Sequence, residues 1–445
     1  MSEVKINRLI LIGNGFDLAN GLKTSFYDFI NFIVYETVLY LETGIKNSLG
    51  IDNNIFETDS EVRVNYRSLL SLIREIKSLI LNTNQNDENI KKIQEIPDKI
   101  EEKYNVEYNY IEKYSLLFDV NFWMDEIDYV LELPIYRYMD PEKIKYQLNI
   151  NKILSGKKLF KNKLFEIIFK NAIPRNEKSK NWGGIEHDFY QTLLNVDKIY
   201  EKIDKKDKIE ILNDEFKDII ICLQGYLNYI NYYHGSSIED TVKAIEKHLK
   251  KPIGNIELSN TYKKKIGLHS EDNIKLNEII FLNFNYTRTI SNYIKSKHND
   301  INAKEIQIHG YLYPDSSIPN QIIFGYGDEM DGSYKELEER NDNRYLKYFK
   351  SLHYLFDQNY KNLLDFLERE KYQVYIWGHS CATSDRVLLQ TIFEHENCVS
   401  VKPFYYRNEK GNDNFADLCA NISRSFKDKK KFRDLLVNKL YCTTL

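Results

Sequence analysis

Residues 8–29 have the sequence RLILIGNGFDLANGLKTSFYDF, in which a short apolar run stops at a Gly-Asn-Gly turn. Ser25 then stands as an N-cap candidate before an amphipathic segment at 26–41, so the pattern predicts a strand, a turn and a helix. Gly13 and Gly15 let a ligand approach the main chain, and amides at such a turn favour phosphates or carboxylates. This order is typical of a buried parallel strand that ends at a ligand-binding edge.

The composition limits the classes of protein that we consider. A chain of 445 residues is too long for one ordinary core, and a net charge of −4 does not favour nucleic acid as a partner. The five cysteines are odd in number and have no CxxC spacing, so we expect neither a disulfide framework nor a zinc site. No signal peptide and no long apolar segment is apparent. We therefore expect a cytoplasmic protein without a membrane partner.

Strand-like runs occur near the N-terminus and again after residue 277, and long charged segments of helical period lie between them. We predict an α/β fold with a mostly parallel, Rossmann-type sheet and a large helical insertion. Residues 1–45 would supply its first strand and helix, 46–275 the insertion, and 276–445 the remainder. The predicted strands are 6–12, 278–283, 305–308, 321–324, 373–377 and 398–406.

Several predicted strands end in short polar turns. Asn285 follows one strand, His309 follows the next, and Gly378-His379-Ser380 follows a third. The carboxyl ends of parallel strands share one edge of a sheet, where ligands bind. We therefore expect these turns to meet the Gly-Asn-Gly turn around one ligand.

His309 and Asn285 are the candidates for chemistry. A histidine between an apolar strand and Gly310 suits a general base, because the free pKa of about 6.5 lies near working pH. Asn285 offers both a donor and an acceptor, which could fix a water or a ribose hydroxyl. The alternatives are a histidine that is merely packed and an Asx-turn that closes the strand.

Asp17 does not suit a phosphate site, because an acid directly after the turn would repel a phosphate placed there. It suits a sugar hydroxyl, a metal ion or the capping of a helix. His379, Ser380 and Asp385 invite a Ser–His–Asp interpretation, but neighbouring His and Ser side chains point apart. Ala382 also stands where a nucleophile elbow has its second Gly. We predict that this glycine turn and the N-terminus of the helix after it contact a cofactor.

A further element, Trp182 to Asp188, opens a helix in the predicted insertion. Its acids suit helix capping, although Glu186 and His187 could instead reach over the ligand. His187, Asp188 and Asp385 have no spacing typical of metal ligands, so we predict no metal site.

Together these motifs resemble the AbiH family of bacterial abortive-infection proteins. The resemblance rests mainly on residues 11–29 and spans nearly the whole chain. More remotely, the motif order is similar to the SIR2-like Rossmann domains of antiphage effectors that cleave NAD. The shorter motifs that support the resemblance to the AbiH family are 182–186, 283–287, 308–310, 324–325 and 378–380.

The resemblance implies a SIR2-like fold in which His309 is the catalytic base and Asn285 orients water or ribose. Three positions depart from the remote pattern: Asp17 replaces a Ser, Thr287 replaces an Asp, and Asp385 lies later than that pattern expects. These departures leave open NAD itself or a related nucleotide. The residues expected to bind the nucleotide are Gly13, Asn14, Gly15, Asp17, Thr287, Gly378, His379, Ser380 and Asp385.

The implied function is antiphage defence by cleavage of an N-glycosidic bond, with NAD as substrate or ligand and no resident cofactor. One alternative is a nucleotide-sensing or partner-binding switch without catalysis. Another is a nuclease that uses Asp17, Glu186 and Asp385 with a divalent metal. The resemblance leaves open a phage-encoded trigger, a partner defence protein and a homo-oligomer, and the insertion would act as a lid or sensor.

Overall fold

The computed structural model describes most of the predicted sheet and part of the predicted insertion. The described residues are 4–33 except 27 and 31, 162–172, 182–201, 207–233, 245–268 except 247 and 250, 274–296, 302–312, and 321–444 except 327, 328 and 409. Residues 46–161 of the predicted helical insertion lie outside them.

The chain divides into two compact units. One consists of Met1–Ser25, Asn181–Asp214 and Gln224–Leu445, and the other of Phe26–Lys180 and Glu215–Leu223. The first unit contains the sheet. In the second unit, helix α8 (Lys163–Ala172) follows Asn162. The side-chain oxygen of Asn162 accepts a hydrogen bond from the amide of Phe165 at 2.8 Å.

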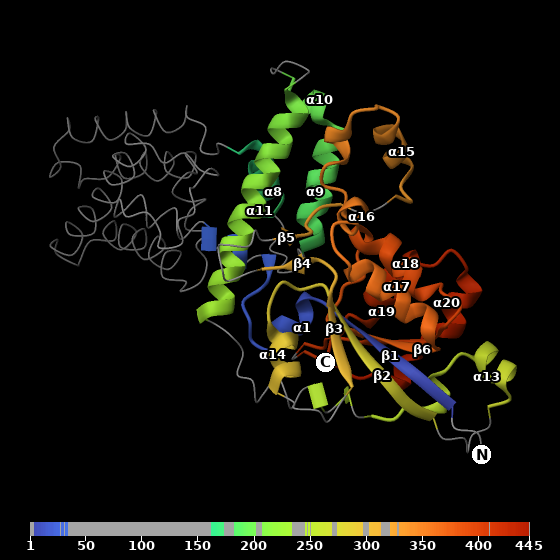
Figure 1. Ribbon diagram of the computed structural model, residues 1–445. Helices are drawn as coiled ribbons and strands as arrows, with labels where there is room; N and C mark the ends of the chain where they lie inside the picture. Colours follow the sequence, from blue (N-terminus) through green and yellow to red (C-terminus); the bar gives the residue numbers. More distant parts are fainter. Residues whose placement is uncertain are drawn as a thin grey trace, which may run out of the picture. The chain divides into compact units, whose positions relative to one another are not determined.

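A five-stranded sheet forms the centre of the first unit, and all neighbouring strands are parallel. Its order is β3-β2-β1-β6-β7, so the first strand of the chain lies in the middle of the strands that follow residue 273 (Figure 1). This confirms the predicted α/β, Rossmann-type sheet. The strands are β1 (Val4–Ile12), β2 (Ile274–Asn283), β3 (Ala303–Gln307), β6 (Tyr372–Trp377) and β7 (Cys398–Phe404).

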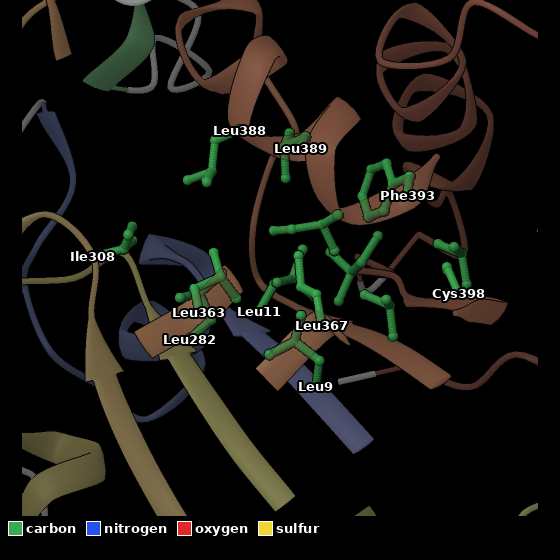
Figure 2. Packing of buried hydrophobic residues seen from close by; sticks show 14 of the residues in the cluster. Leu9, Leu11, Leu282, Ile308, Leu363, Leu367, Leu388, Leu389, Phe393 and Cys398 are labelled. Atoms are coloured by element: carbon green, nitrogen blue, oxygen red, sulfur yellow. The ribbon is translucent and has the colours of Figure 1, made fainter. Parts of the chain in front are cut away.

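Strand β1 is apolar because both faces of the sheet are covered. Leu9 and Leu11 pack on one face, while Ile10 and Ile12 pack on the other. Figure 2 shows Leu9 and Leu11 gathered with Leu363 and other side chains of the first cluster. The alternation of side chains along a strand thus places a continuous apolar run in two cores at once.

Helices from the C-terminal part of the chain cover the first face. Helices α17 (Asn359–Arg369), α18 (Arg386–Phe393) and α19 (Phe415–Arg424) supply Leu363, Leu389 and Ile422 to that core, and they lie together in Figure 1. The other face packs against α14 (Thr289–Ser296) and the short segment around Leu249.

The prediction for residues 321–324 was wrong in one respect, because these residues do not join the parallel sheet. Instead β5 (Gln321–Ile322) pairs antiparallel with β4 (Gly310–Tyr311). Gly310 has a φ of 84°, which turns the chain directly after His309, and the amide of Ile323 then donates to the carbonyl of His309 at 2.7 Å. A short hairpin next to the sheet edge therefore takes the place of a sixth strand.

Further helices of the first unit are short, apart from α9 (Trp182–Leu194) and α11 (Lys208–Tyr233), which continues into the second unit. Helix α9 begins at Trp182, whose indole nitrogen donates to the carbonyl of Thr24 at 2.8 Å. Within the described residues, no helix is long and apolar enough to cross a membrane. The remaining helices are α1 (Asn14–Ala19), α10 (Val196–Ile199), α13 (Asn260–Ile266), α15 (Gly332–Glu338), α16 (Lys350–His353) and α20 (Lys429–Leu435), with 3₁₀ turns η3 (Asn255–Glu257), η4 (Asn343–Leu346), η5 (Thr383–Asp385) and η6 (Lys439–Tyr441).

Candidate functional site

The parallel strands end in one row. Ile12 pairs with Asn283 on one side and with Trp377 on the other, and the row extends through Gln307 and Phe404. The strand order reverses between β1 and β6, and in open α/β sheets this is the point beside which ligands bind. The predicted polar turns therefore lie along the edge where a ligand is expected.

The two glycine turns at this edge pack directly on each other. The amide of Gly13 donates to the carbonyl of Trp377 at 3.0 Å, and the amide of Gly15 donates to the carbonyl of Gly378 at 2.9 Å. A Cβ on Gly13 would lie 2.4 Å from the Cα of His379. Both glycines thus serve the contact between β1 and β6, while their contact with a phosphate stays a prediction, as does that of the half-buried Asn14.

Asn285 joins the turns after β1 and β2. The side chain of Asn283 accepts from the amide of Asn285 at 2.9 Å, so Asn283 makes the Asx-turn that closes the strand. This leaves the side chain of Asn285 to donate to the carbonyl of Gly13 at 3.0 Å. The turns after β1 and β2, which were predicted to meet, are therefore joined by the hydrogen bond from Asn285 to Gly13.

Asp17 does not cap a helix, because it lies inside α1, whose N-cap is Gly13. Its Oδ2 accepts from the hydroxyl of Thr287 at 2.7 Å, which ties α1 to the turn that carries Asn285. Its Oδ1 is buried without a hydrogen bond to any described residue. Burial raises the pKa of Asp17 to about 7, although the hydrogen bond from Thr287 opposes the rise.

We expect Asp17→Asn to make the protein relatively more stable as the pH rises. The pKa of Asp17 is about 7 in the folded protein and 3.8 in the unfolded chain, so between these values the folded protein holds a proton that the unfolded chain has lost. The free energy of unfolding of the wild type therefore falls as the pH rises from 3.8 toward about 7. Asparagine stays neutral and keeps an acceptor for Thr287. Between pH 5 and pH 8 the stability difference should change by roughly 3 kcal/mol in favour of the variant.

Urea unfolding of both proteins at the two pH values measures this change. Asp365→Asn is the control, because Asp365 is exposed on α17 and its loss should leave the pH dependence as it is. Equal pH dependence of the wild type and Asp17→Asn would contradict the assigned burial of this carboxyl.

His309 lies next to an acid that is far away in the sequence. Its Nε2 is 3.2 Å from Oδ1 of Asp385, and both side chains are more than nine-tenths buried. The direction of this contact does not make a hydrogen bond, so Nε2 has no hydrogen-bond partner among the described residues. The same holds for the hydroxyl of Tyr354, whose ring lies parallel to that of His309 at 6.5 Å. Buried polar atoms without partners are uncommon and often mark a site for water or a ligand.

A lysine that the sequence did not single out lies at the centre of this group. The Nζ of Lys350 is 2.8 Å from Oδ1 of Asp385 and 2.8 Å from Oε1 of Glu186. Lys350 is 2 % exposed and Glu186 is 4 % exposed, so neither charge is shared with solvent. Glu186, Lys350, Asp385 and His309 thus form one buried polar cluster, which we call the acid–lysine–histidine cluster.

Local backbone contacts fix the position of Lys350. The amide of Tyr326 donates to the carbonyl of Tyr348, and the amide of Lys350 donates to the carbonyl of Tyr326. Gly325 permits this approach, because a Cβ there would lie 1.9 Å from the carbonyl oxygen of Tyr348. Tyr326 also stacks on Tyr190 of α9 at 3.9 Å, so the helix that carries Glu186 is packed on the same segment.

The protonation states of the cluster follow from its charges. Burial alone would raise the pKa of Asp385, but Lys350 and the two histidines hold it well below its usual range. Burial raises the pKa of Glu186 in spite of Lys350, so Glu186 takes up a proton before Asp385 does. Burial and then the charge of Lys350 lower the pKa of His309 to about 4, although Asp385 acts in the opposite direction. At neutral pH the cluster therefore contains the neutral imidazole of His309, the carboxylate of Asp385 and the ammonium of Lys350, and Glu186 is the acid that is protonated more easily.

His379 faces the same carboxylate from the turn after β6. Its Nδ1 accepts from the amide of Cys381 at 3.1 Å, so Nε2 carries the hydrogen of the neutral ring and lies 3.6 Å from Oδ2 of Asp385. Cys381 holds this turn with a φ of 52°, an uncommon conformation for a residue with a side chain. Ser380 is half-buried and its carbonyl accepts from Asn421, while contact of Ser380 with a nucleotide stays a prediction.

Within the part of the chain that the structure describes, no three acid, histidine or cysteine side chains are grouped as metal ligands. Glu186 and Asp385 do approach each other, but the ammonium of Lys350 lies between them. Asp17 is bonded to Thr287 and not to either acid. His187 is exposed on α9.

The sequence located His309, Asn285 and Asp385 but missed two members of the site. Lys350 lies in a segment with no motif, and Tyr354 is one of 34 tyrosines. Glu186 was considered only as a cap, an overhanging group or a metal ligand. Two short motifs, Trp182–Glu186 and Phe324-Gly325, contained the available signal. They meet in the fold, because the amide of Gly325 donates to Glu186 at 3.4 Å, and Glu186 in turn contacts Lys350.

A family model described as Bacteriophage abortive infection AbiH matches residues 9–406. No curated protein matches the sequence.

Proposed function

The chain belongs to the AbiH family and is a bacteriophage abortive infection protein; we propose that it acts by cleaving the N-glycosidic bond of NAD or a related nucleotide. The observation that carries this proposal is the neutral, buried imidazole of His309, whose Nε2 has no hydrogen-bond partner among the described residues and which lies beside an ionised Asp385. The nucleotide would lie along the edge where β1 and β6 end.

The reaction requires a base and a stabiliser of positive charge. Water adds to the anomeric carbon of the ribose, the bond from that carbon to the base breaks, and its electron pair goes to the departing nicotinamide. The proton that the water loses passes to His309, which can accept it because the imidazole is uncharged. The products are nicotinamide and ADP-ribose.

The charge of the cluster suits such a transition state. Glu186 and Asp385 together with Lys350 carry a net charge of −1 when both acids are ionised. The ribosyl group becomes cationic as nicotinamide leaves, and a fixed negative charge in a site closed to water stabilises a developing cation. The unpartnered hydroxyl of Tyr354 is available to a ribose hydroxyl or to the attacking water.

The nuclease alternative has less support. A divalent ion held by Glu186 and Asp385 would face the ammonium of Lys350, which is 2.8 Å from each of them. Asp17, the third acid of that scheme, is bonded to Thr287. The ammonium of Lys350 already lies between these acids, which favours a role that needs no metal ion there.

A nucleotide-binding switch without catalysis is the second candidate. The observation that favours it is the closure of the cluster, since Glu186, His309, Lys350 and Asp385 are each less than 9 % exposed. Such a protein would respond to a nucleotide by a change in shape and release no product.

Purified full-length protein incubated with NAD tests the proposal, with nicotinamide and ADP-ribose followed by chromatography. We expect both products to form in equal amounts, and His309→Gln to form them at least about 100-fold more slowly. NAD and ATP are compared in thermal unfolding. Stabilisation by a nucleotide that is never cleaved would support the switch and contradict the proposed reaction.

A further inference from the structure

Lys350 neither gives nor takes a proton in the reaction described above, although its ammonium lies between the two carboxyl groups of the cluster. It contacts two carboxylates at 2.8 Å from a position that is 2 % exposed. A buried lysine is held in the charged state only when its surroundings make up for lost hydration. Burial opposes the ammonium, but Asp385 and Glu186 raise the pKa of Lys350 above its ordinary value.

We infer that Lys350 is a positioning residue, which holds Asp385 in place and keeps His309 uncharged so that His309 can act as a base. The same Oδ1 of Asp385 faces both groups, at 2.8 Å from Nζ of Lys350 and 3.2 Å from Nε2 of His309. The negative charge of Asp385 can be balanced by the ammonium of Lys350 or by a protonated His309. Because Lys350 is already charged and bonded, His309 has no need to take a proton.

Removal of Lys350 should transfer this role to His309. Two buried carboxylates would then lack a cation, and the imidazole is the nearest group able to become one. Several polar groups face His309, and of these only Lys350 is a permanent cation. They are Asp385 from η5, His379 from the turn after β6, Lys350 and Tyr354 from α16 and the turn after it, Tyr286 from the turn after β2, and Glu186 of α9 through Lys350.

The consequence for catalysis rests on the proposed function, but the charge of His309 can be measured without any substrate. Full-length protein labelled with ¹⁵N in its nine histidines reports each ring's charge by NMR, and His309→Gln identifies the signal of His309. In the wild type this ring should stay neutral from pH 5.5 to pH 8, since its pKa is about 4. In Lys350→Met it should be charged at pH 5.5, with its pKa higher by about 2 pH units or more.

Two further variants keep the test decisive if Lys350→Met folds poorly. Lys350→Met combined with Glu186→Gln removes the ammonium together with the acid that is protonated more easily, so that within the cluster only His309 remains to pair with Asp385, and His309 should again become charged. Glu186→Gln alone removes a contact of the same kind but leaves Lys350 facing Asp385. In that variant His309 should remain neutral, as it should in Lys350→Arg.

Activity gives the second measurement. If the proposed reaction occurs, the acid limb of the pH–rate profile should move to higher pH in Lys350→Met and return toward the wild type in Lys350→Arg. A purely structural role would lower the rate without moving this limb. A His309 ring that stays neutral in both variants lacking Lys350 would overturn the inference. Absence of NAD cleavage together with the expected titration would instead contradict the proposed function alone.

Discussion

His309→Ala should lower the rate of nicotinamide release by about 10² to 10⁴, the range that removal of a general base produces. The expectation follows from the position of the imidazole, which is 6 % exposed, lies 3.2 Å from Asp385 and keeps Nε2 free of hydrogen bonds to the described residues. The effect should appear in kcat, because a base acts in the transition state and contributes little to holding the nucleotide.

His187→Ala is the matched control for this variant. His187 is exposed on α9 and is the direct neighbour of Glu186, so its loss should leave the rate near that of the wild type. Thermal unfolding of both variants excludes a loss of fold as the cause. An unchanged rate in a well-folded His309→Ala would remove this histidine from the mechanism.

Gly378→Ala should have the largest effect on stability, with a loss of roughly 3 kcal/mol or more. Gly378 has a φ of 68°, which an alanine adopts only with strain, and its Cβ would lie 2.0 Å from the amide nitrogen of Phe16. The neighbouring atom is backbone at the start of α1 and cannot rotate away. The turns after β1 and β6 would have to separate, together with the hydrogen bond from Gly15 to Gly378.

Two other glycines separate the causes of this loss. Gly411 has a φ of 83°, but a Cβ built there would have no atom within 4 Å. Gly411→Ala should therefore show the effect of backbone strain alone. Gly332→Ala has neither feature and should be close to neutral. Melting temperatures measured by circular dichroism should fall in the order Gly332→Ala, Gly411→Ala, Gly378→Ala. A Gly378→Ala variant as stable as Gly411→Ala would mean that the two turns are not packed as described.

The parallel sheet could be predicted because its signal is local. Strand β1 is a continuous apolar run that ends at Gly13, and the strands after residue 273 repeat the pattern of an apolar run followed by a polar turn. Parallel pairing then brings those turns to one edge. The hairpin of β4 and β5 could not be foreseen in the same way, because its pairing depends on the turn at Gly310.

The chemistry of the site was only partly predictable, because it depends on distances between residues far apart in the sequence. Asp17 was expected to face a ligand or cap a helix, yet its Oδ2 is bonded to Thr287. Lys350 has no sequence feature of its own, and its role depends on Glu186, 164 residues earlier, and Asp385, 35 residues later. A periodic pattern shows which residues are buried but not which buried charges are paired.

We propose that phage defence by this chain requires cleavage of a nucleotide at the site of His309. This is tested by following NAD, nicotinamide, ADP-ribose and the other nucleotides in bacteria that carry the wild type or His309→Ala, during infection by a phage against which the wild type protects. We expect NAD or a related nucleotide to fall and its free base to rise in the wild type alone, with protection lost in the variant. Protection by the wild type with no nucleotide cleaved, or equal protection by His309→Ala, would contradict it.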